Sequence, residues 1–398
     1  MRRTLNIIGI EFLAVALAIV ASLHGVVTDE AKYLLNIPYP HPPLFRFLVG
    51  LTRTLPGQEM FWRIVLATLL LQAVWFAISF FPAEQKRERF TVGALWLLSA
   101  AVLIQAGQIL VAQVTALQAL LFCRLLLKGK DLERHAGWIA LLWLASLFTA
   151  YQAILFAPIV LTVFLRMRLP FWKRATAFLF PIFLLGLYSF GNPLALSSMI
   201  TAGEQNASAG SAVDVLRGVL FLWTVGGSIV LSILGTLGMF SARRWSLVGS
   251  LFLLSLFLFL SFRPYYGILF TPLFIAGIAA HPRMLRFTGL SVVLMLFCAA
   301  FIVPRTLPAS DPTPARLVMQ TLAKNRVTEG MVLITGSFGH EWQYESSLVV
   351  QRYNPRLIDS ARAVICLADC PEVRWRERWR ILPGLPVEVW MRTLAAWN

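Results

Sequence analysis

Apolar runs of about 20 residues recur along most of this chain, and they limit its fold more than any other feature. Each run is long enough to cross a hydrocarbon core of roughly 30 Å. Inside a bilayer the backbone amides and carbonyls must bond to one another, so these runs are expected to be helices. Because 58% of the 398 residues are hydrophobic and only 14% are charged, we predict a polytopic α-helical membrane protein.

About eleven membrane spans are predicted within residues 1–303, which form the expected transmembrane domain. An acidic residue, Glu11, lies inside the first span, and we expect it to pair with a neighbouring helix. The segment Leu44–Leu55 is too short to span and is interpreted as an interfacial helix. The spans are expected at Leu5–Val27, at Phe61–Phe81, twice between Thr91 and Leu127, twice within Trp138–Leu165, at Ala175–Phe190, and in four runs that end near Arg244, Ser261, His281 and Val303.

Basic residues fall in every second loop between the predicted spans. Loops that face the cytoplasm carry an excess of Lys and Arg, so this alternation places the N-terminus inside and the C-terminus outside. The formal net charge of +16 is explained by these loops and by contact with anionic membrane lipids, so nucleic acid is not expected as a partner. The basic loops are 84–89, 128–135, 166–174, 243–244 and 281–286.

The tail, residues 304–398, has a more mixed composition and is predicted to be a small extracytoplasmic α/β domain. Ser337 follows the first expected strand and is expected to cap a helix. Cys366 and Cys370 are expected to form a disulfide if this domain lies in an oxidising compartment. Runs typical of strands are Met331–Thr335, Ala363–Leu367 and Val387–Met391.

The segment Asp29–Leu44, between the first two predicted spans, combines charged, aromatic and rigid residues. Asp29 and Glu30 stand at its start, Lys32 and Tyr33 follow, and a turn with the sequence His41-Pro42-Pro43-Leu44 ends it. In residues, spacing and place, this segment resembles the first external loop of polyprenyl-phosphate-sugar-dependent glycosyltransferases of the GT-C type. The nearest branch comprises bacterial relatives of protein O-mannosyltransferases and of the lipid A aminoarabinose transferase.

The resemblance implies that Asp29 is the catalytic base, since a carboxylate can take the proton of an acceptor hydroxyl through a direct hydrogen bond. It also implies that Glu30 orients Asp29 or binds the acceptor. Without the resemblance, Asp29 would be interpreted as a solvated loop residue, and Glu30 as a cap of the following turn.

A leaving polyprenyl phosphate needs cations, and the planar fork of an arginine suits phosphate oxygens. Arg263, followed by Tyr265 and Tyr266, is similar to a basic and aromatic junction of the same family, and the resemblance implies that it holds the donor phosphate. The alternative is that Arg263 and the tyrosines anchor a helix at the membrane interface. Further substrate-binding candidates are Tyr265, Tyr266, Gln113, Lys32, Tyr33, Arg46, Arg53 and His41, the last of which is expected to fix its turn.

Gln113 stands where many relatives of that family carry an aspartate in the second outer loop. Asp29 is therefore expected to act without a second carboxylate. No cofactor is predicted, and a divalent cation has only weak support.

The expected activity is an inverting transfer of a hexosyl or pentosyl group from a polyprenyl-phosphate-linked donor to a lipid, glycan or protein acceptor. The expected location is the outer side of a bacterial inner membrane. The alternative is a polytopic transporter or flippase of a lipid-linked saccharide. Such transporters more often show paired halves with matching broken helices, a repeat that this sequence does not show.

Overall fold

The computed structural model describes residues 2–37, 42–192, 216, 220, 229–260, 264–306 and 312–393. The chain forms two compact units. The first, here called the helical unit, comprises Met1–Ile19 and Pro38–Leu307, and the second, here called the mixed unit, comprises Val20–Ile37 and Pro308–Asn398. The mixed unit therefore includes a segment near the N-terminus, Val20–Ile37, that lies within the transmembrane domain expected from the sequence.

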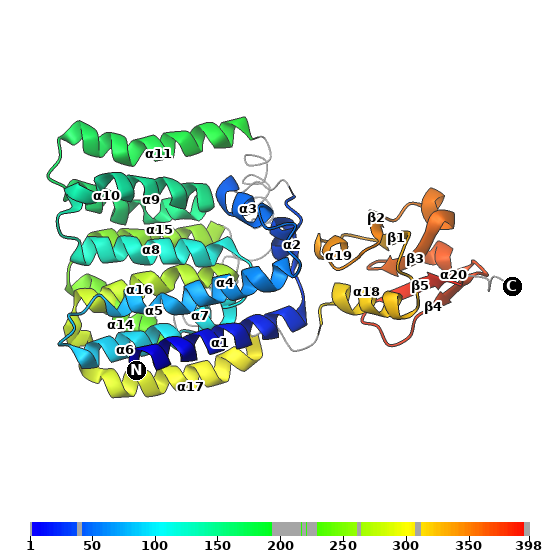
Figure 1. Cartoon of the computed structure of the whole chain (residues 1–398), viewed down its shortest axis with the longest axis horizontal. Helices are drawn as coiled ribbons and strands as arrows, with labels where there is room; N and C mark the ends of the chain where they lie inside the picture. Colours follow the sequence, from blue (N-terminus) through cyan, green and yellow to red (C-terminus); the bar gives the residue numbers. More distant parts are fainter. Residues whose placement is uncertain are drawn as a thin grey trace. The chain divides into compact units, whose positions relative to one another are not determined.

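The described part of the helical unit consists of helices, many of which are joined by short turns (Figure 1). Within it, α9 packs between α11 and α8, and α16 packs between α8 and α14. The helix α1 begins in this unit and ends in the mixed unit. The described helices of the helical unit are α1 (Arg2–His24), α3 (Pro43–Gly50), α4 (Gln58–Gln72), α5 (Val74–Ile78), α6 (Lys86–Leu97), α7 (Ala100–Gln105), α8 (Val111–Lys128), η1 (Leu132–His135), α9 (Ala136–Thr149), η2 (Tyr151–Phe156), α10 (Ala157–Leu165), α11 (Phe171–Gly191), α14 (Ile229–Ser241), α15 (Trp245–Leu260), η4 (Pro264–Leu269), α16 (Phe270–Ala280), η5 (Pro282–Phe287) and α17 (Thr288–Thr306).

Four helices in the described part of the chain are long and apolar enough to cross a membrane, which is fewer than the eleven predicted spans. They are Ile7–His24, Gln58–Ile78, Val111–Lys128 and Phe171–Gly191. Several predicted spans are instead broken into shorter pieces, because turns interrupt them. The predicted split of Trp138–Leu165 is confirmed, since α9 ends at Thr149 and the 3-10 helix η2 separates it from α10. Five shorter apolar helices are Tyr151–Leu165, Ile229–Ser241, Trp245–Phe259, Tyr265–Ala280 and Gly289–Ala300.

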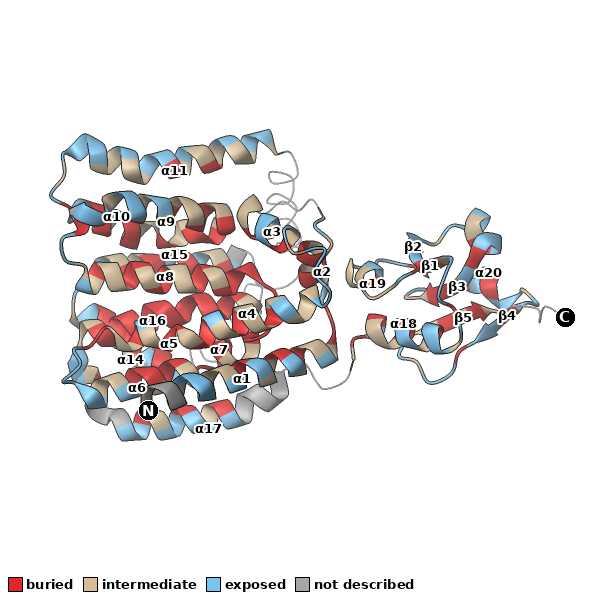
Figure 2. Cartoon of the chain, viewed as in Figure 1, coloured by how far each residue is buried: buried red, intermediate tan, exposed pale blue. Residues whose placement is uncertain are grey.

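The helices of the helical unit differ widely in how many of their residues are buried (Figure 2). Nearly every residue of α16 is buried, whereas α11 buries only Pro181 and Leu185. The other face of α11 exposes large apolar side chains, including Phe180, Phe183 and Phe190. A helix face made of several large, exposed apolar side chains is unfavourable in water, so this face of α11 supports association of the protein with a membrane.

The helices α14 and α16 approach each other closely because glycines face each other at their contact. A side chain on Gly277 would overlap the backbone of Gly235, and one on Gly238 would overlap the backbone of Gly277. Small residues at helix contacts are the usual means of close packing in membranes, where water does not drive apolar groups together.

Glu11 pairs with a neighbouring helix, as the sequence predicts. Its carboxylate accepts hydrogen bonds from the hydroxyl of Thr68 at 2.8 Å and from the amide of Gln72 at 2.6 Å, both on α4. An acidic residue within an apolar helix therefore has donors that satisfy it.

The mixed unit contains a five-stranded sheet with the strand order β2-β1-β3-β5-β4. The strand β1 pairs in parallel with β2 and with β3, while β5 is antiparallel to β3 and to β4. Its elements are α2 (Thr28–Leu34), α18 (Pro314–Lys324), β1 (Met331–Thr335), α19 (Glu341–Tyr344), β2 (Val349–Arg352), η6 (Pro355–Ser360), β3 (Ala361–Cys366), α20 (Pro371–Arg374), β4 (Trp379–Ile381) and β5 (Glu388–Arg392).

Alternating residues of the strands fill two hydrophobic cores, one on each face of the sheet. Val332 and Ile334 of β1 pack with residues of α18 and α19 on one face. Leu333 of the same strand packs with Ile358 of η6 and Val373 of α20 on the other face. The small α/β architecture predicted for the tail is therefore confirmed.

The three predicted strands correspond to β1, β3 and β5, and β2 and β4 are additional. The expected helix cap at Ser337 is wrong, because α19 begins only at Glu341, after the residue His340. Gly336 turns the chain with φ +75° directly after β1, so a loop rather than a helix follows that strand.

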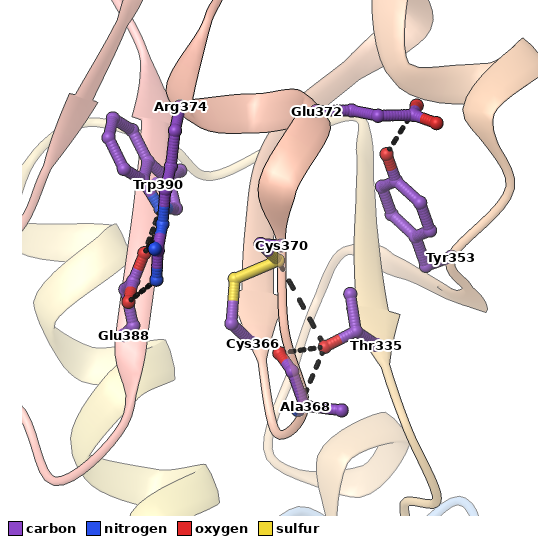
Figure 3. Close-up of a disulfide and its surroundings, with 9 residues drawn as sticks. All are labelled: Thr335, Tyr353, Cys366, Ala368, Cys370, Glu372, Arg374, Glu388 and Trp390. Carbon is purple, nitrogen blue, oxygen red and sulfur yellow. Dashed lines mark hydrogen bonds and ion pairs between the residues drawn. A yellow bond between two sulfur atoms is a disulfide. The ribbon is translucent and has the colours of Figure 1, made fainter.

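The predicted disulfide between Cys366 and Cys370 is confirmed (Figure 3). It closes the loop that follows β3. The hydroxyl of Thr335, at the end of β1, donates to the carbonyl of Ala368 at 2.9 Å and accepts from the amide of Ala368 at 3.0 Å. The ends of two neighbouring parallel strands are therefore tied together.

Candidate functional site

The candidate site residues fall into two groups, one in each unit, and each group is described by itself. Asp29, Glu30, Lys32 and Tyr33 belong to the mixed unit. The predictions for His41 and Arg263 lie outside the described residues. The group in the helical unit comprises Arg46, Arg53, Gln113, Tyr265 and Tyr266.

Asp29 lies in the first turn of α2, five residues beyond the end of α1 at His24. Its carboxylate accepts a hydrogen bond from the ammonium of Lys32 at 3.1 Å. Residues three apart share a helix face, so this pair lies along one side of α2. The side chains of Asp29 and Lys32 are 28% and 17% exposed, which leaves both partly open to solvent.

Glu30 lies on the buried side of the same helix, with Tyr33 and Leu34. Glu30 is only 1% exposed, and its carboxylate accepts the backbone amide of Val27 at 3.1 Å. That amide precedes the first turn of α2 and has no partner within the helix, so Glu30 acts as a cap. Among the three roles considered for Glu30, the capping of α2 is supported by this direct contact. That Glu30 orients Asp29 or binds the acceptor stays a prediction.

In the helical unit, buried glutamines and tyrosines form a neutral polar network. The amide of Gln113 on α8 donates to the backbone carbonyls of Gln105 and Gln108, each at 2.6 Å. The amide of Gln105 donates to the backbone carbonyl of Tyr265 in η4. Gln113 and Gln105 therefore link the turn after α7 to α8 and η4.

The second half of this network joins η4 to η2. The amide of Gln152 donates to the hydroxyl of Tyr266 at 2.6 Å, and the rings of Tyr265 and Tyr266 contact edge to face with centroids 4.6 Å apart. Gln113, Gln152 and Tyr266 are buried, and Tyr265 is half-buried. The structure thus brings three of the predicted site residues, Gln113, Tyr265 and Tyr266, into one network.

Each of three glutamines of this network keeps a side-chain oxygen that is buried and has no hydrogen-bond partner among the described residues. These oxygens belong to Gln105, Gln113 and Gln152. Buried polar atoms are nearly always hydrogen-bonded in folded proteins, so such oxygens are suited to accept hydroxyl groups of a ligand or water.

Arg46 and Arg53 lie on α3 and directly after it, and not on the elements that form this network. Arg46 is half-buried on α3, and Arg53 is exposed in the turn after it. The helix predicted over Leu44–Leu55 forms, but it begins at Pro43 and ends at Gly50.

Sequence reasoning missed Arg63, which is 1% exposed in α4. Its guanidinium bonds to Glu59 at 2.8 Å and to the backbone carbonyl of Gly107 at 2.9 Å. Glu59 and Arg63 are four residues apart at the start of a predicted span, and this spacing could have identified the pair. Arg63 fixes the turn between α7 and α8, next to the polar network.

An apolar groove of about 490 Å³ opens between α3, α9 and α11. It is lined only by apolar residues, among them Phe47, Leu144, Phe148 and Leu184. A groove of this composition fits a hydrocarbon chain and offers nothing to a charged ligand.

No three His, Cys, Asp or Glu side chains lie close enough to hold a metal ion within the part of the chain that the structure describes. Comparison of the chain with protein-family models, with curated proteins and with solved structures finds no match.

Proposed function

We propose that this protein is an inverting glycosyltransferase that moves a sugar from a polyprenyl-phosphate-linked donor to a lipid, glycan or protein acceptor. The reaction would take place on the outer side of a bacterial inner membrane, with the N-terminus in the cytoplasm. The helical unit would then supply the eleven spans of a GT-C type domain, some of them broken into shorter helices.

The observation that carries this proposal is the position of Asp29. The carboxylate is partly exposed in the first turn of a short helix, directly beyond a helix that is long and apolar enough to cross a membrane. A base for sugar transfer needs this combination, because it must meet the acceptor at the membrane surface while the donor lipid stays in the bilayer.

In the proposed reaction Asp29 takes the proton of an acceptor hydroxyl. The acceptor oxygen forms a bond to the anomeric carbon of the sugar, and the bond from that carbon to the phosphate oxygen breaks. Polyprenyl phosphate leaves with the electron pair, and attack from the opposite face inverts the anomeric configuration. A general base typically contributes about 10²–10⁴ to the rate of such a step.

Two features of the helical unit support a lipid-linked sugar as the donor. The side-chain oxygens of Gln105, Gln113 and Gln152, which have no hydrogen-bond partner among the described residues, would accept hydrogen bonds from sugar hydroxyls, and neutral groups suit a neutral sugar. The apolar groove beside α3 would hold part of the polyprenyl chain. Lys32, Arg46, Arg53 and Arg263 remain the proposed cations for the phosphate.

The test is single-turnover sugar transfer by the reconstituted protein with Asp29→Asn. Asparagine keeps the size of the side chain but cannot take the proton, so we expect the rate to fall by about 10²–10⁴ while donor binding survives. A matched control is Asp359→Asn, since Asp359 is an aspartate of the same unit that is also paired with a cation, Arg376. Transfer by Asp29→Asn at the wild-type rate would exclude this residue as the base.

The second candidate function is transport of a lipid-linked saccharide. It is favoured by the buried polar network, because polar side chains inside a membrane protein often mark a substrate path. A transporter would move a fluorescent lipid-linked sugar across vesicles without forming a glycosylated product. It would also keep this movement when Asp29 is replaced by asparagine.

A further inference from the structure

The junction between α1 and α2 is short, and its backbone groups need partners from elsewhere. Only Gly25, Val26 and Val27 separate His24, where α1 ends, from Thr28, where α2 begins. The last carbonyls of one helix and the first amides of the next have no partner within their own helices. Glu30 caps the amide of Val27, and residues from the C-terminal part of the mixed unit supply partners for Ser22, His24 and Val26.

An ion pair of Arg316 and Glu345 binds both sides of the junction. The guanidinium of Arg316 donates to the backbone carbonyl of Ser22 in α1. The carboxylate of Glu345 accepts the amide of Val26 at 3.1 Å, although these residues are 319 positions apart. The two side chains bond to each other at 2.9 Å and are only 15% and 9% exposed, so water screens this pair weakly.

Two further contacts join the same elements. The amide of Thr313 donates to the carbonyl of His24 at 2.8 Å, which satisfies the end of α1. The hydroxyl of Thr28, at the start of α2, donates to the carboxylate of Glu341 on α19. Gly339 permits this approach, since a side chain there would overlap the hydroxyl of Thr28.

Gly25 shows how tightly the junction is packed. Its φ of +107° is a conformation that other residues rarely adopt. A side chain at this position would lie 3.0 Å from the guanidinium of Arg316 and 3.1 Å from the carboxylate of Glu345. The ion pair therefore sits directly against the backbone that it holds.

We infer that Arg316 and Glu345 are positioning residues for Asp29, an inference that rests on the proposed role of Asp29 as the base. The helix α2 has only seven residues, and so short a helix is not stable through its own backbone bonds. Asp29 is its second residue, three positions after the amide that Glu345 holds. Loss of the ion pair would free the start of α2 and with it the direction of the Asp29 carboxylate.

The experiment replaces Glu345 by glutamine in the full-length protein. Glutamine still offers an oxygen to the amide of Val26 but cannot neutralise Arg316. We expect amide hydrogen exchange in residues 25–34 to become on the order of 10- to 100-fold faster, because Arg316 loses the carboxylate that neutralises its charge in a poorly hydrated place. We expect kcat to fall about tenfold or more while KM for the donor stays unchanged, since misplacement of a catalytic group acts on the chemical step.

Two variants make the test specific. Arg316→Lys keeps the charge but lacks the fork that reaches both Glu345 and Ser22, so its effects should lie between those of wild type and Glu345→Gln. Glu388→Gln removes an exposed ion pair with Arg374 in the same unit, and it should change neither exchange in residues 25–34 nor transfer.

Unchanged exchange in Glu345→Gln would overturn the inference, and so would faster exchange with transfer at the wild-type rate. Failure of the proposed function would be recognised by a different result, because the Asp29→Asn variant would then transfer sugar at the wild-type rate. In that case the exchange measurement would still decide whether the ion pair holds α2.

Discussion

Gln152 and Tyr266 are a hydrogen-bonded pair of polar side chains inside the largely apolar helical unit. The amide of Gln152 donates to the Tyr266 hydroxyl, and both residues are buried. Tyr266→Phe would leave the buried amide without this acceptor, so we expect a loss of about 1–3 kcal/mol in unfolding free energy. Thermal or denaturant unfolding in detergent measures it.

The double variant Gln152→Leu with Tyr266→Phe is the control for this prediction. It removes both polar partners at similar volume, and such replacements can be nearly neutral. A double variant that is less stable than Tyr266→Phe alone would show that the pair is not the source of the effect.

Asp29 and Glu30 are neighbours with opposite environments. The side chain of Asp29 is 28% exposed and pairs with Lys32, whereas Glu30 is 1% exposed and caps α2. We therefore expect Glu30→Gln to act mainly on stability, because glutamine keeps an oxygen for the Val27 amide but weakens a charge-assisted bond.

At the level of elements, the contact of α14 with α16 depends on backbone proximity. A methyl group on Gly277 would overlap the backbone of Gly235, so the helices would have to separate. We expect Gly277→Ala to destabilise the protein by about 1–3 kcal/mol, the usual cost of overpacking. The midpoint of thermal unfolding in detergent measures this loss.

Gly186 provides a matched comparison, since it also lies inside an apolar helix but has open space around it. Gly186→Ala should be neutral or stabilising by up to about 1 kcal/mol, because alanine is the better helix former. Equal effects at the two positions would contradict a role for close packing of α14 and α16.

At the level of the whole molecule, we expect acid to lower the stability of the folded mixed unit by protonating Glu388. Hydrogen bonds from Trp390 and Arg374 hold the pKa of this carboxyl below its ordinary value of 4.5 (Figure 3). A lowered pKa means that the ionised form stabilises the folded state above about pH 4.5, and this stabilisation is lost as the pH falls through the folded-state pKa.

The stability difference between wild type and Glu388→Gln should therefore be largest near neutral pH and shrink below about pH 4.5. Calorimetric unfolding of the full-length protein between pH 3 and pH 7 measures it. Glu377→Gln serves as the control, because Glu377 is exposed and we observe no ion pair for it among the described residues. A difference that does not change with pH would contradict the assignment.

The sequence by itself determined the features that depend on local patterns. Apolar runs predicted the helices, β-branched runs predicted β1, β3 and β5, and the spacing of Cys366 and Cys370 allowed their disulfide. These predictions succeed because the periods of helices and strands act on neighbouring residues. The number of spans is not matched, since four helices in the described part of the chain, against eleven predicted spans, are long and apolar enough to cross a membrane. Breaks within the apolar runs, such as the one between α6 and α7, were not predicted, because the apolar pattern continues across them.

Only the tertiary structure decided which distant residues complete the candidate site. The resemblance led to Asp29, but it gave no indication that Glu345 and Arg316 hold the backbone before α2. It also led to Gln113, whose contacts with the turn after α7 became visible only in the fold. Sequence spacing cannot predict hydrogen bonds between residues hundreds of positions apart. The reason is that the backbone groups at helix ends bond to whichever side chains the packing brings near them.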